Sequence, residues 1–216
     1  MLNERGPLMI KRCLQVIDDF YDRPDEVRQK ALLMSYAQPD GFVGWRTLAY
    51  QPKGIKQTIE RRFKISIRYW EKDLAATEAS NGVFFSAFSK GKFAERVGIH
   101  YDDPAGWMML LVYLTPDALL DAGTSTWQHR ETGLIAKPTR QDASRLGMSL
   151  KALEMKLIED SHKLKSWREV DRIGNVYNRA VMFPSRLLHS ATKHFGRNHL
   201  EGRLYQAFHF PIRRAR

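Results

Sequence analysis

The stretch that decides the fold is "IHYDD" at residues 99–103, with the apolar run "WMMLLVYLT" at 107–115 close behind it. An apolar run of this length, bounded by turn formers, is typical of a β-strand that is buried on both faces. A polar turn before a core strand is one explanation of the histidine and the two acids. The other is that His100 and Asp102 hold a metal ion, because alternate residues of a strand face the same side, about 6.6 Å apart.

Further short strands are expected along the rest of the chain, separated by turn formers such as Pro116-Asp117 and Gly202. The sequence predicts strands at 14–21, 82–88, 96–102, 107–115, 123–130, 179–184, 187–192 and 203–210.

Three helices are expected beside these strands. Asp22 is a plausible N-cap for the first, which places Val27, Ala31 and Met34 on one face. The second covers about 54–64, and the third lies between about 144 and 165 along a leucine stripe. Strands in series, with helices at one end and in one insert, predict an α+β, mainly β fold: a sandwich or jelly roll with packed helices.

The size and composition are those of a soluble globular protein. The 216 residues are 43% hydrophobic and 27% charged, and we find no linker, so a single domain over 1–216 is expected. No apolar run approaches the roughly 20 residues of a membrane-spanning helix. The N-terminal stretch mixes charge into its apolar segments, and Cys13 is the only cysteine, so we expect a cytoplasmic protein.

Positive charge is the strongest compositional bias. The formal net charge is +11, and the segment 179–216 has eight basic residues against the single acid Glu201. Such a field favours anionic ligands or nucleic acid as partners. A solubilising surface with a basic tail explains the charge equally well.

A third ligand and an anion-binding residue come from the C-terminal part of the chain. His189 lies in the apolar segment "RLLHSAT" and would complete a site of two histidines and one carboxylate, a set that suits iron(II). Arg203 opens the strand "RLYQAFHF", where it shares a face with Tyr205, Ala207 and His209. A buried guanidinium is costly unless an anion meets it, and its planar fork matches a carboxylate.

This order of residues resembles the 2-oxoglutarate- and iron(II)-dependent dioxygenases, which are built on a double-stranded β-helix of the jelly-roll or cupin type. "HYDDPAGWMMLLVYLTPD" resembles a strand pair of the prolyl-hydroxylase-like members. "VIDDFYDRPDEVRQKAL", "AGTSTWQHRETGL" and "NRAVMFPSRLLHSATKHFG" with "EGRLYQAFHF" resemble an uncharacterised bacterial branch. The resemblance covers about 14–210.

The resemblance implies a role for five residues. His100, Asp102 and His189 would bind Fe(II), which would also take 2-oxoglutarate and O2. Arg203 would pair with the far carboxylate of 2-oxoglutarate, and Tyr113 would donate its hydroxyl to the same group. Related halogenases lack the carboxylate ligand, so Asp102 implies hydroxylation or another oxidation.

The interval between His189 and Arg203 departs from the family's pattern. It is longer than in many members, and it contains His194 and His199, either of which is an alternative ligand. We expect His189 to be the ligand, because His194 and His199 lie among Lys, Gly, Arg and Asn in a sequence typical of a loop.

Substrate contacts are expected on the strand "TSTWQHR". Gln128 and Arg130 share one face of it, and Arg130 is a candidate to bind a substrate carboxylate. The alternative is a surface arginine paired with Glu131 or Asp121. We interpret His162 and His209 as structural.

The sequence therefore favours an oxygenase that hydroxylates a small molecule, amino acid or peptide, with an anionic substrate favoured by the charge, and that releases succinate and CO2. Two other classes stay open. One is a β-barrel that binds a metal or ligand without turning it over. The other is a nucleic-acid-binding module that uses the basic C-terminal third.

Overall fold

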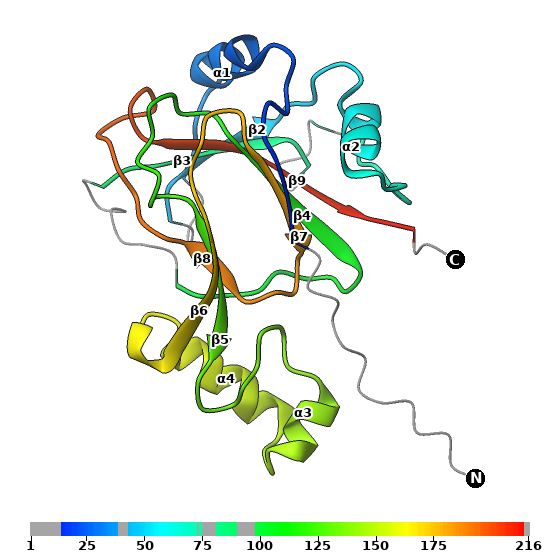
Figure 1. Cartoon of the computed structure of the whole chain (residues 1–216), viewed down its shortest axis with the longest axis vertical. Coiled ribbons are helices and arrows are strands. Elements are labelled where there is room, and N and C mark those ends of the chain that lie inside the picture. The colour runs from blue at the N-terminus through cyan, green and yellow to red at the C-terminus, as the bar shows by residue number, and fades with distance from the viewer. Residues whose placement is uncertain (1–13, 39–42, 73, 75–80, 90–97, 214–216) are drawn as a thin grey trace.

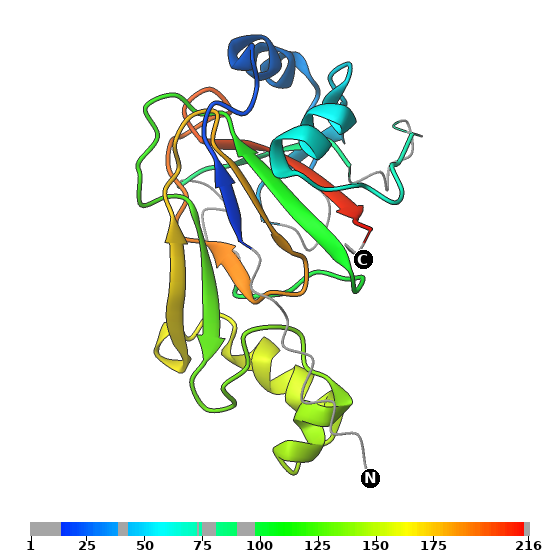
Figure 2. The ribbon, with the colours of Figure 1, turned by 45° about the vertical axis from the view of Figure 1, so that its right-hand side comes forward.

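The computed structural model describes residues 14–38, 43–72, 74, 81–89 and 98–213, and its strands form two antiparallel sheets (Figures 1 and 2). The large sheet has the strand order β1-β7-β4-β9-β3-β2, and the small sheet has the order β6-β5-β8. The strands are β1 (Gln15–Ile17), β2 (Trp45–Ala49), β3 (Val83–Ala87), β4 (Trp107–Tyr113), β5 (Thr124–His129), β6 (Trp167–Ile173), β7 (Ala180–Pro184), β8 (His189–Ala191) and β9 (Arg203–Pro211). The mainly β architecture predicted from the sequence is thus confirmed.

The helices lie at the two ends of this arrangement. In Figure 1, α1 and α2 lie beside the large sheet, and α3 and α4 lie at the opposite end, next to β5 and β6. The helical segments are α1 (Pro24–Leu33), α2 (Ile55–Phe63), α3 (Arg140–Arg145), α4 (Leu150–Asp160) and the 3-10 turn η1 (Leu164–Ser166).

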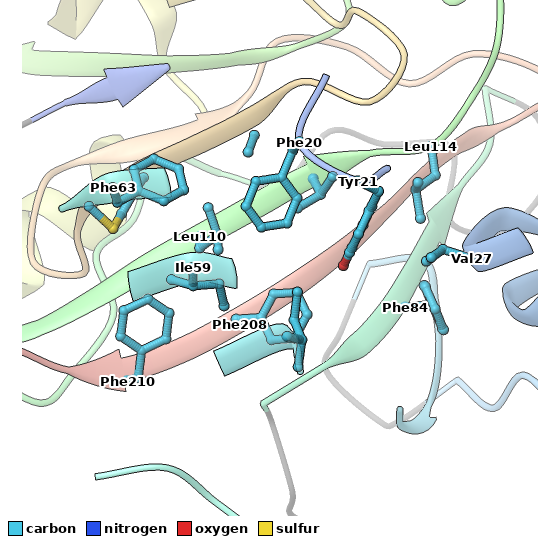
Figure 3. Packing of buried hydrophobic residues seen from close by; sticks show 14 of the residues in the cluster. Phe20, Tyr21, Val27, Ile59, Phe63, Phe84, Leu110, Leu114, Phe208 and Phe210 are labelled. Atoms are coloured by element: carbon cyan, nitrogen blue, oxygen red, sulfur yellow. The ribbon is translucent and has the colours of Figure 1, made fainter. Parts of the chain in front are cut away.

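The largest apolar cluster lies between the large sheet and helices α1 and α2 (Figure 3). Helix α2 contributes Ile55, Ile59 and Phe63, whose spacing by four residues places them in one stripe. They pack with the even-numbered residues of β4, such as Leu110, and with Phe208 of β9. Each such side chain contributes roughly 1.5–3 kcal/mol by burial, so this layer fixes the outer face of the sheet.

The opposite face of the large sheet meets the small sheet. Leu111 of β4, Phe183 of β7 and Ala207 of β9 belong to one buried cluster with Ile173 of β6. Strand β4 is therefore buried on both faces, as the apolar run predicted. The space between the sheets is the place where inward-facing polar residues meet.

The helix expected between about 144 and 165 is present as α4, but it is shorter than expected, and a separate helix, α3, precedes it. Thr139 and Asp142 make a reciprocal capping box at the start of α3. After α3 the chain turns at Gly147, which has a φ of +65°, and the Ser149 hydroxyl then accepts from the backbone N–H of Ala152 to begin α4. The turn splits the leucine stripe, although Leu153 and Leu157 remain buried.

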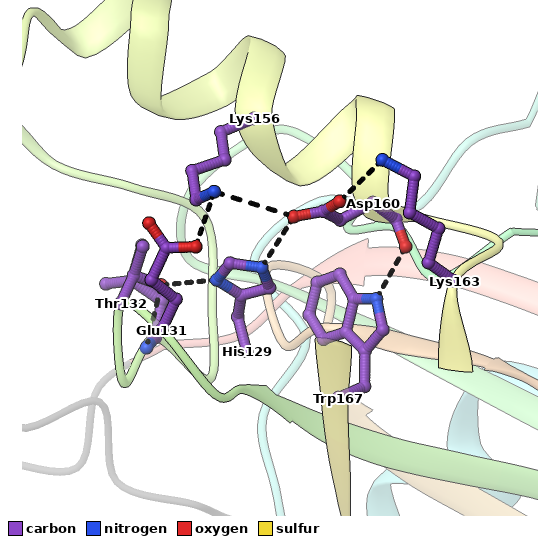
Figure 4. Close-up of polar contacts among 8 residues, drawn as sticks. His129, Glu131, Thr132, Lys156, Asp160, Lys163 and Trp167 are labelled. Atoms are coloured by element: carbon purple, nitrogen blue, oxygen red, sulfur yellow. Dashed lines mark hydrogen bonds and ion pairs between the residues drawn. The ribbon is translucent and has the colours of Figure 1, made fainter. Parts of the chain in front are cut away.

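A buried polar network fastens α4 to the small sheet (Figure 4). His129 of β5 is fully buried, with one ring nitrogen 2.9 Å from the Thr132 hydroxyl and the other 3.1 Å from the Asp160 carboxylate. The Trp167 indole donates to the carbonyl of Asp160 at 2.8 Å, and Lys163 donates to its carboxylate at 2.9 Å. These contacts satisfy polar groups that would be costly to bury alone.

Other boundaries differ from the sequence-based expectations. Strands β2 and β6 were not predicted, and β1 is shorter than 14–21. Arg23, not Asp22, occupies the N-cap position of α1. Of the strand expected at 96–102, residues 96 and 97 lie outside the described residues, and within the remainder His100 makes an isolated bridge to His189.

Within the described ranges, no helix combines the length and the apolar character that crossing a bilayer requires.

Candidate metal centre

His100, Asp102 and His189 come together between the two sheets. The Nε2 atom of His100 lies 4.0 Å from one carboxylate oxygen of Asp102, and the Nε2 atom of His189 lies 3.5 Å from the other. One donor atom from each residue lies within 4.8 Å of the other two, which is the only such group of metal-ligating side chains among the described residues. Two segments of chain, the one before β4 and β8, thus supply one cluster.

Hydrogen bonds to the backbone orient both imidazoles. The Nδ1 atom of His100 lies 2.8 Å from the carbonyl oxygen of Gly98, and that of His189 lies 2.8 Å from the carbonyl oxygen of Leu187. A carbonyl only accepts, so each Nδ1 carries a proton, and Nε2 is the atom of each ring that is left for a metal. Such a bond on the far nitrogen is the usual support of a metal-binding histidine.

His189 is held uncharged by its surroundings. The residue is 6% exposed, and its ring lies against Phe183 with ring centroids 4.8 Å apart. Burial lowers the pKa of His189 to about 4, with a further contribution from His100, while Asp102 and the Leu187 carbonyl act in the opposite direction. A neutral imidazole is the form that binds a metal.

The donor set fits a divalent first-row metal. Donor atoms about 2.1 Å from a shared ion lie about 3–4 Å apart, close to the spacing found here. Two imidazoles and one carboxylate form the facial set typical of non-haem iron(II) sites, which leaves further coordination positions open.

Arg203 is buried nearby and spans the two sheets. It is 3% exposed on β9 of the large sheet, and it donates to the carbonyl oxygens of Ala122 and Gly123, both at 3.1 Å. It also donates to the hydroxyl of Thr124 on β5 at 3.3 Å. No described carboxylate forms an ion pair with it, so a buried positive charge stays available for an anion.

Tyr113 lies beside this guanidinium. Its hydroxyl is 2.8 Å from the Thr124 hydroxyl, and the Arg203 guanidinium lies 5.6 Å from its ring centre. Burial raises the pKa of Tyr113, so the phenol stays protonated, and in this structure it donates to Thr124. Arg203 and Tyr113 together present donors of the kind that a carboxylate accepts.

Tyr205 interacts electrostatically with both Arg203 and Asp102. The Arg203 guanidinium lies 4.5 Å from its ring centre. Burial raises the pKa of Tyr205; the charge of Arg203 acts to lower it and that of Asp102 to raise it. Tyr205 is therefore within electrostatic reach of both the guanidinium and the metal-ligand carboxylate.

The other histidines between His189 and Arg203 lie outside the cluster. His199 stacks on Tyr36 with ring centroids 4.0 Å apart, and His194 is buried in the loop after β8.

The two residues expected to contact substrate are engaged within the chain. Gln128 donates to the carbonyl of Gly133 and accepts from Arg168, and the Nε of Arg130 donates to the carbonyl of Trp167 at 2.9 Å. Arg130 thus bonds a backbone carbonyl, whereas the alternative interpretation had paired it with Glu131 or Asp121. A substrate contact by either residue stays a prediction.

His209, interpreted from the sequence as structural, is connected to the Asp102 segment through Ser185. The structure places its Nε2 2.7 Å from the hydroxyl of Ser185, and the backbone N–H of Asp102 donates to the carbonyl of Ser185 at 2.9 Å. The alternation of β9 had placed His209 on the same face as Arg203, which was the available signal.

Comparison with known proteins gives a family and a fold. The profile of the family of unknown function DUF6445 matches residues 8–208. No curated protein matches the chain.

The crystal structure of HygX from Streptomyces hygroscopicus with nickel, 2-oxoglutarate and hygromycin B bound matches with a TM-score of 0.55 at 10% identity, over 93% of this chain and 83% of that one. A prolyl-4-hydroxylase from Pseudomonas putida matches with a TM-score of 0.40 at 12% identity, over 95% of each chain. The likeness to HygX is one of fold.

Proposed function

The chain belongs to the DUF6445 family, and we propose that it is an iron(II)- and 2-oxoglutarate-dependent oxygenase of the prolyl-hydroxylase-like type, built as one domain on a double-stranded β-helix. The observation that carries the proposal is the meeting of His100, Asp102 and His189, with a buried guanidinium in the same inter-sheet space. HygX, whose fold this chain resembles, holds nickel and 2-oxoglutarate in its crystal structure.

The residues divide into two groups. His100, Asp102 and His189 hold the iron through two Nε2 atoms and a carboxylate. Arg203 would bind the distal carboxylate of 2-oxoglutarate by charge, and the Tyr113 hydroxyl, which here donates to Thr124, would turn to donate to the same group. Bound iron and 2-oxoglutarate supply the oxidising chemistry that consumes O2 and releases succinate and CO2.

The remaining wall of the site keeps water away. Phe183 packs on the ring of His189, and Leu111 belongs to the same inter-sheet cluster. An apolar wall strengthens the electrostatic contacts inside the site and protects the reaction from side products. The substrate is a small molecule, an amino acid or a peptide, and the outcome favoured by a carboxylate ligand at position 102 is hydroxylation.

The test has two steps. Anaerobic addition of Fe(II) and 2-oxoglutarate to the metal-free protein should produce a weak visible charge-transfer band that neither addition produces alone. Addition of O2 should then release succinate, faster in the presence of a substrate from a panel of metabolites, amino acids and peptides.

A protein that binds both ligands but releases no succinate would be a binding module, the first alternative. Nucleic acid binding that is steeply weakened by salt and unaffected by His100→Ala, without the band, would favour the second.

A further inference from the structure

The inner face of β9 continues past Arg203 and Tyr205 to His209, which the proposed mechanism does not use. His209 is paired in register with Met109 of β4, and its ring lies 4.8 Å from that of Trp107. Trp107, Met109 and His209 are all partly buried, so this end of the inter-sheet face is an aromatic and apolar wall with one imidazole in it.

Ser185 attaches this wall to the metal-ligand segment. Its hydroxyl lies 2.7 Å from Nε2 of His209, and its backbone N–H donates to the carbonyl of Trp107 at 3.0 Å. Its own carbonyl accepts from the backbone N–H of Asp102. A single residue thus separates His209 from a metal ligand, so a molecule against this wall lies next to the metal centre.

One nitrogen of His209 remains available. Ser185 engages Nε2, whereas Nδ1 has no hydrogen-bond partner within the part of the chain that is described. Burial lowers the pKa of His209, against an opposing contribution from Asp102. The ring therefore offers a hydrogen-bonding atom without a charge.

The neighbouring charges do not favour an anion here. Asp102 adds negative charge next to the wall. Two cations, Lys137 and Arg186, reach the adjacent stretch, but both are paired with the carboxylate of Asp103. An anion at the wall would lose hydration beside the Asp102 carboxylate, and Lys137 and Arg186 are already neutralised by Asp103, whereas a neutral polar group would lose much less hydration.

We propose that Trp107, Ser185 and His209 form a substrate subsite that binds an uncharged hydroxyl or amide group, through Nδ1 of His209, with the ring of Trp107 against the apolar part of the same moiety. Ser185 is the positioning residue, because it fixes the ring of His209. The subsite rests on the proposed function for its role in turnover. It replaces the expectation of an anionic group, drawn from net charge, with a neutral one at this position.

The test uses the full chain loaded with Zn(II) and 2-oxoglutarate, labelled with 15N in histidine, and acetamide and acetate as probes. The His209 ring signals are assigned by their loss in His209→Gln, or by their proximity to Trp107 protons if that variant does not fold. Acetamide should shift the His209 signals and saturate at a concentration about fivefold lower than acetate, because the anion loses more hydration on entering the wall, by about 1 kcal/mol for that ratio. Trp107→Ala should weaken the acetamide effect, and His162→Phe should not.

Two results would contradict the proposed subsite. Absence of a His209 shift with acetamide, or binding of acetate as tight as that of acetamide, would overturn the subsite. The proposed function is tested separately, by the change in the 15N signals of the His100 and His189 rings as zinc is added. If those signals do not respond to the metal, the oxygenase proposal fails, and the acetamide titration of His209 in the metal-free protein still decides the subsite.

Discussion

His100 and His189 exchange both of their backbone hydrogen bonds. The N–H of His100 donates to the carbonyl of His189 at 3.0 Å, and the N–H of His189 donates to the carbonyl of His100 at 2.8 Å. Their rings lie with centroids 4.5 Å apart. The main chain therefore sets the separation of the two imidazoles, and a metal has little reorganisation to induce.

Replacement of His189 should abolish metal-dependent colour. In His189→Ala the cluster loses one of its three donors, so the charge-transfer band formed with Fe(II) and 2-oxoglutarate should disappear. His194→Ala, which alters a buried histidine outside the cluster, should keep most of the band. Anaerobic absorption titrations of the two variants make the comparison. A normal band in His189→Ala would mean that another side chain is the third ligand.

Replacement of Arg203 should weaken 2-oxoglutarate binding and leave metal binding in place. Loss of a buried charge partner costs about 2–5 kcal/mol, so Arg203→Met should raise the Kd of 2-oxoglutarate by roughly 30-fold or more. Calorimetry with Ni(II), before and after addition of 2-oxoglutarate, measures the two affinities.

Arg203→Lys and Arg130→Met serve as controls for that experiment. Arg203→Met also removes the donors to the carbonyls of Ala122 and Gly123, whereas Arg203→Lys keeps the charge and loses only the fork. The lysine variant should have an intermediate affinity, and Arg130→Met should bind as the wild type does. Equal affinities in all four proteins would remove Arg203 from the cofactor site.

The stability of the metal-free protein should fall with acidification through a defined window. The pKa of His189 is about 4 in the folded state and near 6.5 when unfolded. Between these values the unfolded chain binds a proton that the folded chain does not. The free energy of unfolding should therefore fall as the pH is lowered from about 6.5 to 4, by up to roughly 3 kcal/mol from this group.

Urea denaturation at a series of pH values measures that slope. The comparison is with His189→Leu, which has no titratable group at this position and should show a shallower dependence over the same window. Parallel curves for the two proteins would show that the imidazole of His189 titrates normally.

Gly123 should tolerate no side chain. A Cβ atom there would lie 1.8 Å from the carbonyl oxygen of Ile173 on the neighbouring strand. Gly123→Ala should cost about 3 kcal/mol or more, because backbone must move. It should also weaken 2-oxoglutarate binding, since the carbonyl of Gly123 accepts from Arg203.

The matched variant is Gly133→Ala. A Cβ atom at Gly133 would meet nothing within 4 Å, but the residue has a φ of +73°. The expected cost is about 1–2 kcal/mol from the left-handed backbone alone. Thermal unfolding compares the two variants, and an equal loss of stability would argue against close packing at Gly123.

The sequence predicted those elements whose signal is local. Helix α2 has a strong apolar period and strand β4 is a continuous apolar run, and both were found close to their expected bounds. Strand β6 is an edge strand with charged residues along it, so its sequence "WREVDRI" lacked the apolar alternation of the others. Strand β2 lies in a stretch rich in turn formers, which hid it.

Contacts between segments that are distant in the sequence were harder to predict. The alternation of β9 indicated which residues share a face with Arg203, but not that His209 would meet Ser185. Likewise, the segment around His100 lacks strand character of its own in the described residues and is held by pairing with His189. Such pairings depend on the whole topology, and local propensity carries no signal for them.

The reciprocal bonding of His100 and His189 has a mechanical consequence. An ion bound by both imidazoles would close a loop of about 90 residues between His100 and His189. Like a covalent cross-link, it would lower the conformational entropy of any partly opened form of the chain. Proteases should therefore cut the metal-free chain sooner than the metal-loaded one. The first cuts should fall where the pairing of His100 with His189 is lost.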